Sequence, residues 1–387
     1  MRTQMRNAFT RAVAGSVMLL MPVALSAQGT ISTQGFGYPL AGTSTRAAGT
    51  AGALLEFDLL SPRNPSSLTG LGRAVLAVQA EPELRTLTFN SIKENSRVQR
   101  VPLLMAGVRL SSKAVLSFSS AGFLDRNYTT TSAGEALVGN VVLPTKDVQD
   151  MRGSIADLRA GLGYRVLPRL SIGLAGHVFT GSNKLDLLRT FDDSTGFGKV
   201  NETSGVAFFG KALSFGSTLL LPKGFLAAAS FRKGFGIEAD NGDTVLTRAK
   251  IPDRIGAGLL YTGFAGSSFA FNVDKTKWSS MQKLGTSLLQ THDATNWSAG
   301  GEVSTARVRG SPVLLRAGAG KNTLPFGLNG GTVTEQRFAG GAAVAITSAG
   351  RDQAVLDFSV TRANRKLSGS TAKEGAWLLG IGIQIRP

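Results

Sequence analysis

Residues 251–278 alternate apolar and polar side chains with a period of two, which is the pattern of β-strands with one oily face. A turn at residues 263–266 separates two such runs and predicts a hairpin. The apolar positions are Ile255, Ala257, Leu259, Tyr261, Phe269, Phe271 and Val273. The pattern recurs to the end of the chain, and no long 3.6-residue period follows residue 30 that would supply helices to cover a sheet. A sheet closed on itself in a membrane is therefore predicted.

The strand with the clearest alternation is 155–166. Leu158 and Leu162 fall on its apolar face, and Asp157 and Arg159 fall on the other. A three-residue turn at 167–169 leads to the next strand. Turns this short are typical of the periplasmic end of a bacterial barrel, so the polar stretches 124–150, 182–202 and 279–294 are predicted to be long external loops.

Fifteen stretches after residue 70 qualify as candidate strands. Besides the opening hairpin they are 73–80, 84–92, 103–110, 114–123, 155–166, 170–178, 205–220, 225–235, 296–305, 312–320, 336–348, 353–365 and 374–386. Bacterial barrels have an even number of strands. We therefore expect an all-β fold, an antiparallel transmembrane barrel of fourteen strands formed by residues 71–387, with one of the fifteen stretches wrongly assigned.

Residues 1–27 have the composition of a secretory signal peptide, with three early Arg, a short apolar run and small residues at the end. Cleavage after Ser26 or after Ala27 fits the pattern. The absence of Cys suits a protein exported through an oxidising compartment. Without residues 1–27 the net charge falls from +17 to 17 − 3 = +14. These charges are scattered rather than clustered with aromatics, so nucleic acid is not expected as a partner. An anionic outer leaflet such as lipopolysaccharide, or an anionic ligand, is the expected counterpart, and a plain solvated surface is the alternative.

Residues 28–70 do not alternate and are rich in glycine and polar groups. Such a segment cannot face lipid, so it lies either inside the barrel or outside the membrane. Its sequence resembles the amino-terminal hatch of the FadL superfamily of outer-membrane transporters. The motif runs through Asp58 to Asn64, Pro65 and Ser66, where the family usually has Asn-Pro-Ala.

The resemblance continues in order through residues 35–387, including the Pro252-Asp253 opening of the hairpin, Arg316-Ala317-Gly318 and Gly340-Gly341-Ala342. It implies a monomeric fourteen-stranded barrel whose hatch plugs the lumen. It also implies uptake of hydrophobic molecules and their release sideways beside an inward-kinked strand. One departure from outer-membrane barrels in general is the carboxyl terminus, which is Ile385-Arg386-Pro387 rather than an aromatic residue.

The sequence gives no sign of a catalytic or metal site, and no enzyme activity, cofactor or metal is expected. Only two histidines are present, His177 on a predicted lumenal face and His292 in a loop. A lone lumenal histidine usually completes a hydrogen-bond network. A lipid hydrolase would need a nucleophile beside His177, for which Ser171 or Ser182 are the nearest candidates.

The remaining polar and aromatic residues fit structural roles. Asp157, Asp274 and Asp357 fall on polar faces near Arg159, Lys275 and Arg362, which suggests lumenal salt bridges. Four aromatics near predicted strand ends are expected at the lipid headgroups. They are Tyr261, Trp278, Trp297 and Trp377.

The first hypothesis for function is passive uptake of a hydrophobic or amphipathic, fatty-acid-like molecule across the outer membrane of a Gram-negative bacterium. A plugged barrel with an apolar pocket gives such a molecule a route that a water-filled pore does not. The second hypothesis is a related barrel that serves as a scaffold or shuttle in protein secretion. The third is a lipid hydrolase.

Overall fold

The computed structural model describes residues 31–32, 37–40, 42–61, 63–90, 92–191, 196, 198–284, 289–308, 311–328, 331–348 and 351–386. The predicted signal peptide, residues 1–27, lies outside this part of the chain. The chain divides into two compact units. The described residues of the larger unit lie within 31–128, 151–184 and 205–386, and those of the smaller within 129–150 and 185–204. No helix among the described residues is long and apolar enough to cross a bilayer.

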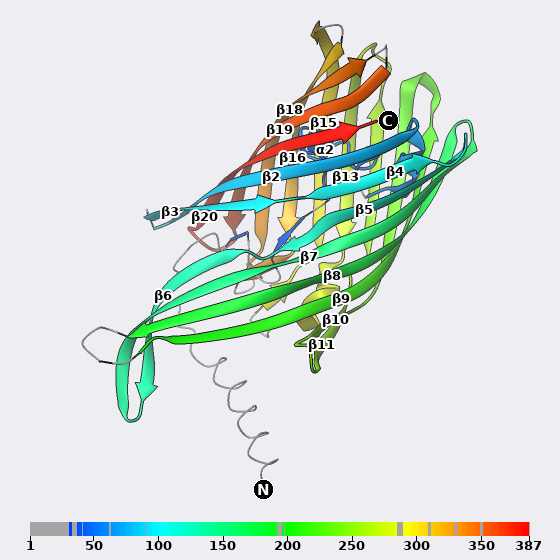
Figure 1. The fold of residues 1–387 in the computed structure, drawn as a ribbon. Coiled ribbons are helices and arrows are strands. Elements are labelled where there is room, and N and C mark those ends of the chain that lie inside the picture. Colours follow the sequence, from blue (N-terminus) through cyan, green and yellow to red (C-terminus); the bar gives the residue numbers. More distant parts are fainter. Residues whose placement is uncertain are drawn as a thin grey trace. The chain divides into compact units, whose positions relative to one another are not determined.

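The wall of the larger unit is an antiparallel sheet that closes on itself when the last strand, β20, pairs with the first, β2 (Figure 1). Fourteen wall strands occur in the described part of the chain, as predicted. They are β2 (Ala74–Phe89), β4 (Leu103–Arg109), β5 (Ala114–Asp125), β7 (Val141–Leu167), β8 (Leu170–Phe191), β9 (Val200–Leu220), β10 (Phe225–Asp240), β12 (Arg254–Tyr261), β13 (Ser267–Thr276), β15 (Ala294–Val308), β16 (Ser311–Leu324), β18 (Val333–Ser348), β19 (Arg351–Leu367) and β20 (Lys373–Ile385).

The fifteenth predicted strand came from dividing β2 in two. The stretches 73–80 and 84–92 were separated at Pro82, yet the structure has one strand across it. Pairing with β20 stops at Ala80 and resumes at Glu83 in the same register. Proline lacks an N–H and removes a ladder bond without ending the strand.

Shorter strands extend the sheet, except β14 (Leu289–Thr291) and β17 (Phe326–Leu328), which form a separate two-stranded sheet. β3 (Ile92–Arg100) and β4 both pair with β2, and β6 (Tyr128–Val138) precedes β7. β11 (Val245–Lys250) pairs with the end of β10, and β14 pairs with β17. The prediction that 124–150 is a loop is therefore wrong, since it holds β6 and the start of β7. The predicted loop 182–202 is likewise mostly strand. These stretches have no continuous oily face, and that face was the signal used to assign strands.

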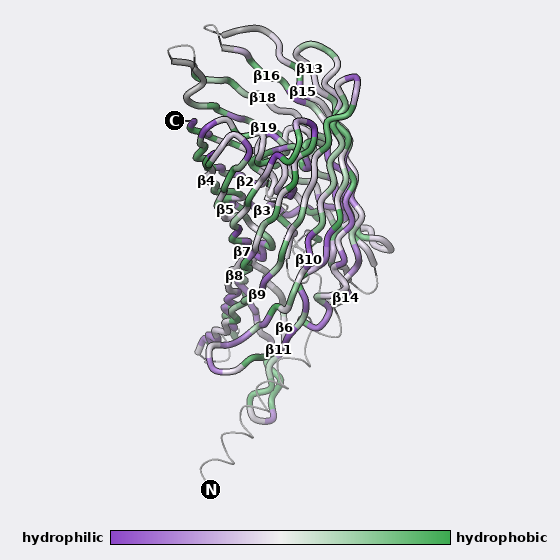
Figure 2. Tube along the Cα trace, turned by 90° about the vertical axis from the view of Figure 1, so that its right-hand side faces the viewer, coloured by the Kyte–Doolittle hydropathy of each residue, from purple (hydrophilic) through white to green (hydrophobic). Residues whose placement is uncertain are grey.

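The two faces of the wall strands are oriented as the alternation predicted. Leu158 and Leu162 on β7 are 43% and 42% exposed, whereas Asp157 and Arg159 are buried. In Figure 2 hydrophobic and hydrophilic segments alternate along such strands. The outer face of the barrel is thus apolar, and most of the inner face is polar.

The smaller unit is held by polar contacts between its two chain segments. Arg189 donates two hydrogen bonds to Asp147, at 2.9 and 2.6 Å. Thr190 donates to the Lys146 carbonyl, and within the second segment Thr203 donates to Asp186.

The described residues 37–71, called here the N-terminal segment, contact inward-facing residues of many wall strands. The segment contains β1 (Tyr38–Pro39), the helical turn α2 (Thr45–Ala48) and a 3-10 turn at Pro65–Gly70. In Figure 1, α2 lies within the barrel, where it contacts β18, β19 and β20.

Glycines in the wall make room for the N-terminal segment. A Cβ on Gly318 of β16 would collide with the Thr50 backbone, and one on Gly216 of β9 would collide with Asn64. Gly173 of β8 lies equally close to Pro65. Glycines on inner faces therefore mark where this segment passes.

Candidate functional site

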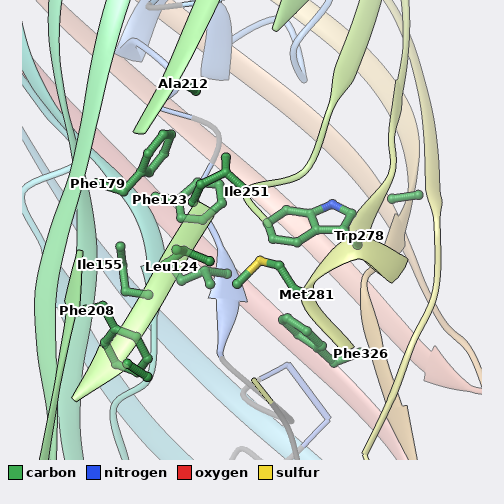
Figure 3. Close-up of a cluster of buried hydrophobic side chains, with 13 residues drawn as sticks. Phe123, Leu124, Ile155, Phe179, Phe208, Ala212, Ile251, Trp278, Met281 and Phe326 are labelled. Atoms are coloured by element: carbon green, nitrogen blue, oxygen red, sulfur yellow. The ribbon is translucent and has the colours of Figure 1, made fainter. Parts of the chain in front are cut away.

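One side of the lumen carries apolar side chains where a barrel interior is usually polar. This lumenal cluster (Figure 3) consists of Phe123, Leu124, Ile155, Phe179, Phe208, Ala212, Ile237, Ala239, Ile251, Trp278, Met281, Ala294 and Phe326. Its members come from β5, β7, β8, β9, β10, β15 and β17, from residue 251, and from a 3-10 turn at Trp278–Leu284. Residues more than 200 positions apart thus form one apolar surface.

Aromatic rings form the centre of the lumenal cluster. The ring of Phe123 stacks on Trp278 with centroids 5.3 Å apart and meets Phe179 edge to face at 4.7 Å. Trp278 meets Phe326 at 5.9 Å. These separations are within the range of favourable aromatic pairs.

Strand β5 brings both Phe123 and Leu124 inward at a β-bulge, where its register against β7 shifts between Gly122 and Leu124. Phe123, Leu124 and Asp125 are all buried, whereas a wall strand alternates. The ladder between β4 and β5 ends where Gly122 donates to the Pro102 carbonyl, and Leu124 and Asp125 pair instead with β1. Pro102 cannot donate a bond to continue the ladder. The bulge therefore bends β5 inward where it contacts the N-terminal segment, while its pairing with β7 continues to Asp125.

A cavity of about 100 Å³ borders the lumenal cluster. Phe123, Trp278 and Leu324 line it on the apolar side. Arg232 and Asp274 are among its polar lining residues. The cavity is amphipathic, and a molecule in it meets both aromatic rings and charged groups.

A row of polar side chains, called here the polar row, crosses the inner wall beside the lumenal cluster. It contains Asp157 of β7, His177 of β8, Ser214 of β9, Arg232 of β10 and Arg254 of β12. Ser214 is paired with Arg232, and Arg232 with Arg254, in the strand ladders. His177 Nδ1 lies 2.8 Å from Asp157, and its Nε2 lies 2.7 Å from the Ser214 hydroxyl. The guanidinium of Arg232 lies 5.5 Å from the Phe123 ring centroid and 5.6 Å from that of Phe179.

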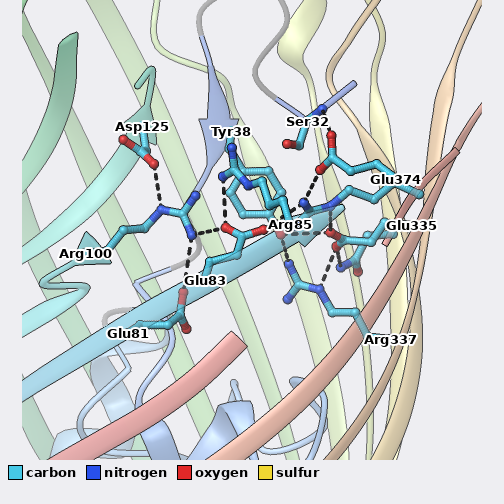
Figure 4. Close-up of polar contacts among 12 residues, drawn as sticks. Ser32, Tyr38, Glu81, Glu83, Arg85, Arg100, Asp125, Glu335, Arg337 and Glu374 are labelled. Atoms are coloured by element: carbon cyan, nitrogen blue, oxygen red, sulfur yellow. Dashed lines mark hydrogen bonds and ion pairs between the residues drawn. The ribbon is translucent and has the colours of Figure 1, made fainter. Parts of the chain in front are cut away.

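The opposite side of the lumen is occupied by an ion-pair network (Figure 4). Its residues are Tyr38, Glu81, Glu83, Arg85, Arg100, Asp125, Asn322, Glu335, Arg337, Arg365 and Glu374. Arg365 is 1% exposed and contacts Glu83 at 2.8 Å, Glu335 at 2.6 Å and Glu374 at 2.5 Å. The Tyr38 hydroxyl donates to Glu335 at 2.9 Å. The network fixes β1 of the N-terminal segment to β18 and β19.

The four predicted hatch residues lie in the N-terminal segment and make local hydrogen bonds. Asp58 accepts from the hydroxyls of Ser44 and Ser61. Asn64 Oδ1 accepts from the Ser66 backbone and hydroxyl, at 3.0 and 2.7 Å, and caps the turn that Pro65 begins. Asn64 also donates to the Ser217 carbonyl of β9 at 3.3 Å.

The predicted lumenal ion pairs are partly wrong in their partners. Asp357 pairs with Arg316 and accepts from Gln384, not from Arg362. Asp274 accepts from Asn296 and lies 3.8 Å from Arg254, while Lys275 points to the other face. Asp157 is hydrogen-bonded to His177. Adjacent residues of a strand face opposite sides, so the partners come from neighbouring strands.

Two further sequence assignments are corrected by the structure. Ser171 bonds Thr69 and Ser182 is exposed, so neither accompanies His177, whose partner is Ser214. Trp278 is 6% exposed in the lumenal cluster, whereas Trp297 and Trp377 are exposed as expected of residues that meet lipid. His292 accepts no hydrogen bond on Nε2 from the described residues.

The lumenal cluster was not predicted from the sequence, although a signal for it exists. Where a wall strand passes the cluster, two successive residues are large and apolar, as in Val178-Phe179 and Phe208-Phe209. Both faces of the strand are then apolar, which breaks the alternation. Among the described residues no group of three or more His, Asp or Glu is placed to hold a metal ion.

The comparisons with known proteins show similarity in structure but not in sequence. No protein-family model matches the chain, and neither does any curated protein. A FadL homologue of Pseudomonas aeruginosa superposes with a TM-score of 0.63 at 12% identity, over 91% of this chain and 99% of the other.

Two toluene transporters share the same fold. TbuX of Ralstonia pickettii superposes with a TM-score of 0.60 at 15% identity, over 90% of this chain and 99% of its own. TodX of P. putida gives a TM-score of 0.57 at 12% identity, over 89% and 98%. The chain therefore has the fold of these barrels along nearly its whole length.

Proposed function

We propose that this protein is an outer-membrane channel for passive uptake of hydrophobic or amphipathic, fatty-acid-like small molecules. The barrel shares its fold with a FadL homologue and with two toluene transporters. Its outward face is apolar, as contact with lipid requires. In this proposal residues 1–27 direct export, the mature chain acts as a monomer, and its basic balance favours lipopolysaccharide as the surrounding lipid. Transport, and not catalysis, is its main activity.

The observation that carries the proposal is the lumenal cluster beside the cavity. Thirteen buried apolar residues inside a lumen offer a surface from which water is excluded. At about 25 cal/mol per Å², a ligand that buries 150 Å² of apolar surface there gains about 4 kcal/mol. That gain is large enough to attract a molecule that avoids water.

The polar side of the cavity supports an amphipathic ligand. Arg232 lies over two rings of the lumenal cluster and also lines the cavity. A molecule whose apolar body packs on Phe123 and Trp278 can place a carboxylate or hydroxyl against this guanidinium.

We infer that the N-terminal segment acts as a plug and that the ligand leaves sideways. The segment packs against wall glycines, and Asn64 to Ser66 lie against β9. Phe123 and Leu124 belong both to the lumenal cluster and to the inward bend of β5. A ligand on the cluster is therefore next to the point where the ladder between β4 and β5 ends.

Tryptophan fluorescence tests ligand binding at this site. The protein has three Trp, of which Trp278 is buried in the cluster and Trp297 faces outward. Adding a fatty acid should quench the fluorescence of the protein, and Trp278→Phe should remove most of that quenching. Trp297→Phe is the matched control. Quenching that survives Trp278→Phe would place the ligand elsewhere.

Uptake by vesicles tests transport and the plug. Trp278→Ala should slow entry of a labelled fatty acid into outer-membrane vesicles, whereas Trp297→Ala should not. Deletion of residues 29–60 should leave an assembled barrel that leaks small hydrophilic solutes. Vesicles that take up no hydrophobic compound, from a protein that co-purifies with a secreted protein, would favour the scaffold hypothesis instead.

A further inference from the structure

Three members of the polar row form a continuous hydrogen-bonded chain that transport does not use. The Ser214 hydroxyl lies 2.7 Å from His177 Nε2, and His177 Nδ1 lies 2.8 and 3.0 Å from the two oxygens of Asp157. All three side chains are buried. They come from β9, β8 and β7, so the chain depends on strand register and not on a local motif.

The direction of each hydrogen bond follows from the carboxylate. An ionised Asp157 can only accept, so His177 Nδ1 carries a proton and donates it. In the neutral ring Nε2 is then an acceptor, and the Ser214 hydroxyl donates to it. A hydroxyl, a basic ring nitrogen and an orienting carboxylate in this order are the parts of a nucleophilic relay.

The surroundings of Ser214 suit an acyl substrate. Arg232 lies opposite Ser214 in the ladder between β9 and β10. Asp157 and Arg232 both line the cavity that borders Phe123 and Trp278, so the Asp157 end of the relay faces that cavity. Ala212 lies two positions before Ser214 on β9, and Phe179 lies two positions after His177 on β8. Both belong to the lumenal cluster and share the face of the relay residues.

Positive charge without a full set of partners lies beside the relay. Three buried guanidinium nitrogens have no hydrogen-bond acceptor in the described part of the chain. They are Nε and Nη2 of Arg159 and Nε of Arg232. Arg159 follows Asp157 by two positions on the same face of β7. Buried guanidinium N–H groups of this kind stabilise negative charge that develops on a bound molecule.

We propose that Ser214, His177 and Asp157 form a hydrolytic site for small apolar carboxylic esters that occupy the cavity beside the lumenal cluster. Ser214 Oγ attacks the ester carbonyl while His177 Nε2 takes the hydroxyl proton and passes it to the leaving alcohol. Water then attacks the Ser214 acyl ester and gives its proton to His177. The carboxylic acid leaves, and the proton returns to Ser214. The net reaction converts an ester and water into an acid and an alcohol. Asp157 is a positioning residue.

Covalent labelling tests the nucleophile directly. The purified full-length protein, reconstituted in phospholipid vesicles, is treated with a small alkyl fluorophosphonate and digested for mass spectrometry. We expect one adduct, on the peptide that contains Ser214. The location of the adduct is read on the wild-type protein, so it does not depend on the folding of any variant. An unlabelled Ser214 under conditions that label a control serine esterase overturns the proposal.

Variants distinguish a catalytic role of this hydrogen-bonded chain from a purely structural one, called here a strut. Ser214→Ala and His177→Gln should each lower hydrolysis of p-nitrophenyl butyrate on the order of 10³-fold. The control is Ser230→Ala, a buried lumenal serine that bonds Glu56 and Arg254 and should leave hydrolysis unchanged. Asp157→Asn should lower the rate and alter its pH profile, which loss of a strut alone would not do. Equal rates for wild type and His177→Gln would overturn the proposal.

The proposal rests on the proposed function only in that an ester must reach the lumenal cluster. A small reagent applied to purified protein needs no uptake. Labelling at Ser214 without fatty-acid uptake would therefore contradict transport and leave hydrolysis standing, while uptake without labelling would do the reverse.

Discussion

The ion-pair network (Figure 4) and the lumenal cluster both consist of inward-facing side chains, but the network is charged and the cluster is apolar. On the side of β2, β18, β19 and β20, Arg365 and three carboxylates fill the space and bind the N-terminal segment through Tyr38. In the lumenal cluster, by contrast, Phe123, Trp278 and Ala294 line a cavity. The ion-pair network holds the N-terminal segment in place, whereas the lumenal cluster leaves an apolar space.

The difference shows how a barrel can be stable and still contain a binding site. Buried ion pairs need nearly ideal geometry, because each charge has lost its water. They therefore define one arrangement of the N-terminal segment. Apolar contacts are not directional, so the lumenal cluster can accept ligands of varied shape. Three predictions test this contrast, and a fourth concerns an ion pair outside the lumen.

The largest effect is expected from Arg365→Met in the ion-pair network. Glu83, Glu335 and Glu374 would lose a shared cation inside the lumen, at a cost of about 3–5 kcal/mol in the free energy of unfolding. The measurement is the urea midpoint for loss of the fast-migrating, unboiled form on gels. In the control, Arg248→Met, the broken pair with Glu238 is exposed and is expected to cost less than about 1 kcal/mol. Equal costs would show that the network does not fasten the barrel.

A smaller effect is expected where the N-terminal segment meets wall glycine. The Cβ of Gly318→Val would strike the Thr50 backbone, and overpacking of this kind costs about 1–3 kcal/mol. The variant should also leak hydrophilic solutes in liposome-swelling assays. Gly340→Val serves as control because its Cβ has only the Arg316 carbonyl at 3.8 Å nearby. A tight Gly318→Val barrel would contradict a plug at this level.

A change on the apolar side should alter binding more than stability. Ala294→Val adds two methyl groups where Ala294 lines the cavity. We expect the free energy of unfolding to change by less than about 1 kcal/mol and the affinity for a fatty acid to fall about tenfold, which is about 1.4 kcal/mol. Titration calorimetry measures both a binding enthalpy and the affinity. Unchanged affinity would mean that the ligand does not occupy this cavity.

The smallest effect concerns a pair outside both sides of the lumen. A strand crosses a bilayer in about 9–11 residues, so Asp147, some twenty positions before the turn after Leu167, is not in a spanning segment. Hydrogen bonds from Arg189 lower the pKa of Asp147 despite its partial burial.

The lowered pKa of Asp147 determines how the contribution of this pair to stability changes with pH. The folded pKa lies below the unfolded value of about 3.9, so the pair stabilises fully above that value and the contribution is lost as the pH falls through the folded pKa. Asp147→Asn should therefore reduce stability at pH 7 by less than about 1 kcal/mol, and this difference should disappear as the pH falls through the folded pKa of Asp147. A difference that persists at low pH would exclude the ion pair as its cause.

The sequence predicted the wall well because lipid imposes a simple rule on it. Leu158, Leu162, Ile255 and Phe271 face outward as the period of two required. The number of strands was also confirmed, and the one surplus stretch traces to Pro82. Where a strand has no continuous apolar face, as in β6, the same reasoning failed.

The site could not be predicted because its parts meet only when the strand register is known. Ser214 lies 37 positions from His177, and Asp157 lies 20 from it. Neither spacing is a motif. Trp278 is an aromatic residue at the end of a predicted strand, as interfacial residues are, and only the turn at Trp278–Leu284 directs it inward. The hatch residues Asp58, Asn64, Pro65 and Ser66 were recognised by resemblance, and their role as a plug stays a prediction.

The pairing of β2 with β20 has a consequence for how the chain is assembled. Its partners Leu76 and Ile385 are separated by nearly the whole chain, so the sheet cannot close before the last strand is available. The entropic free energy of closing a loop of about 300 residues is only about 2.4 kcal/mol greater than that of closing one of 20. Closure of the sheet is therefore delayed by the order in which the strands become available and not by a large free-energy cost. The contacts of Thr45 with Gln79 and of Thr50 with Gly318 lie inside that ring. The N-terminal segment must therefore be in place when the last strand arrives, and that strand encloses the segment when it pairs with β2.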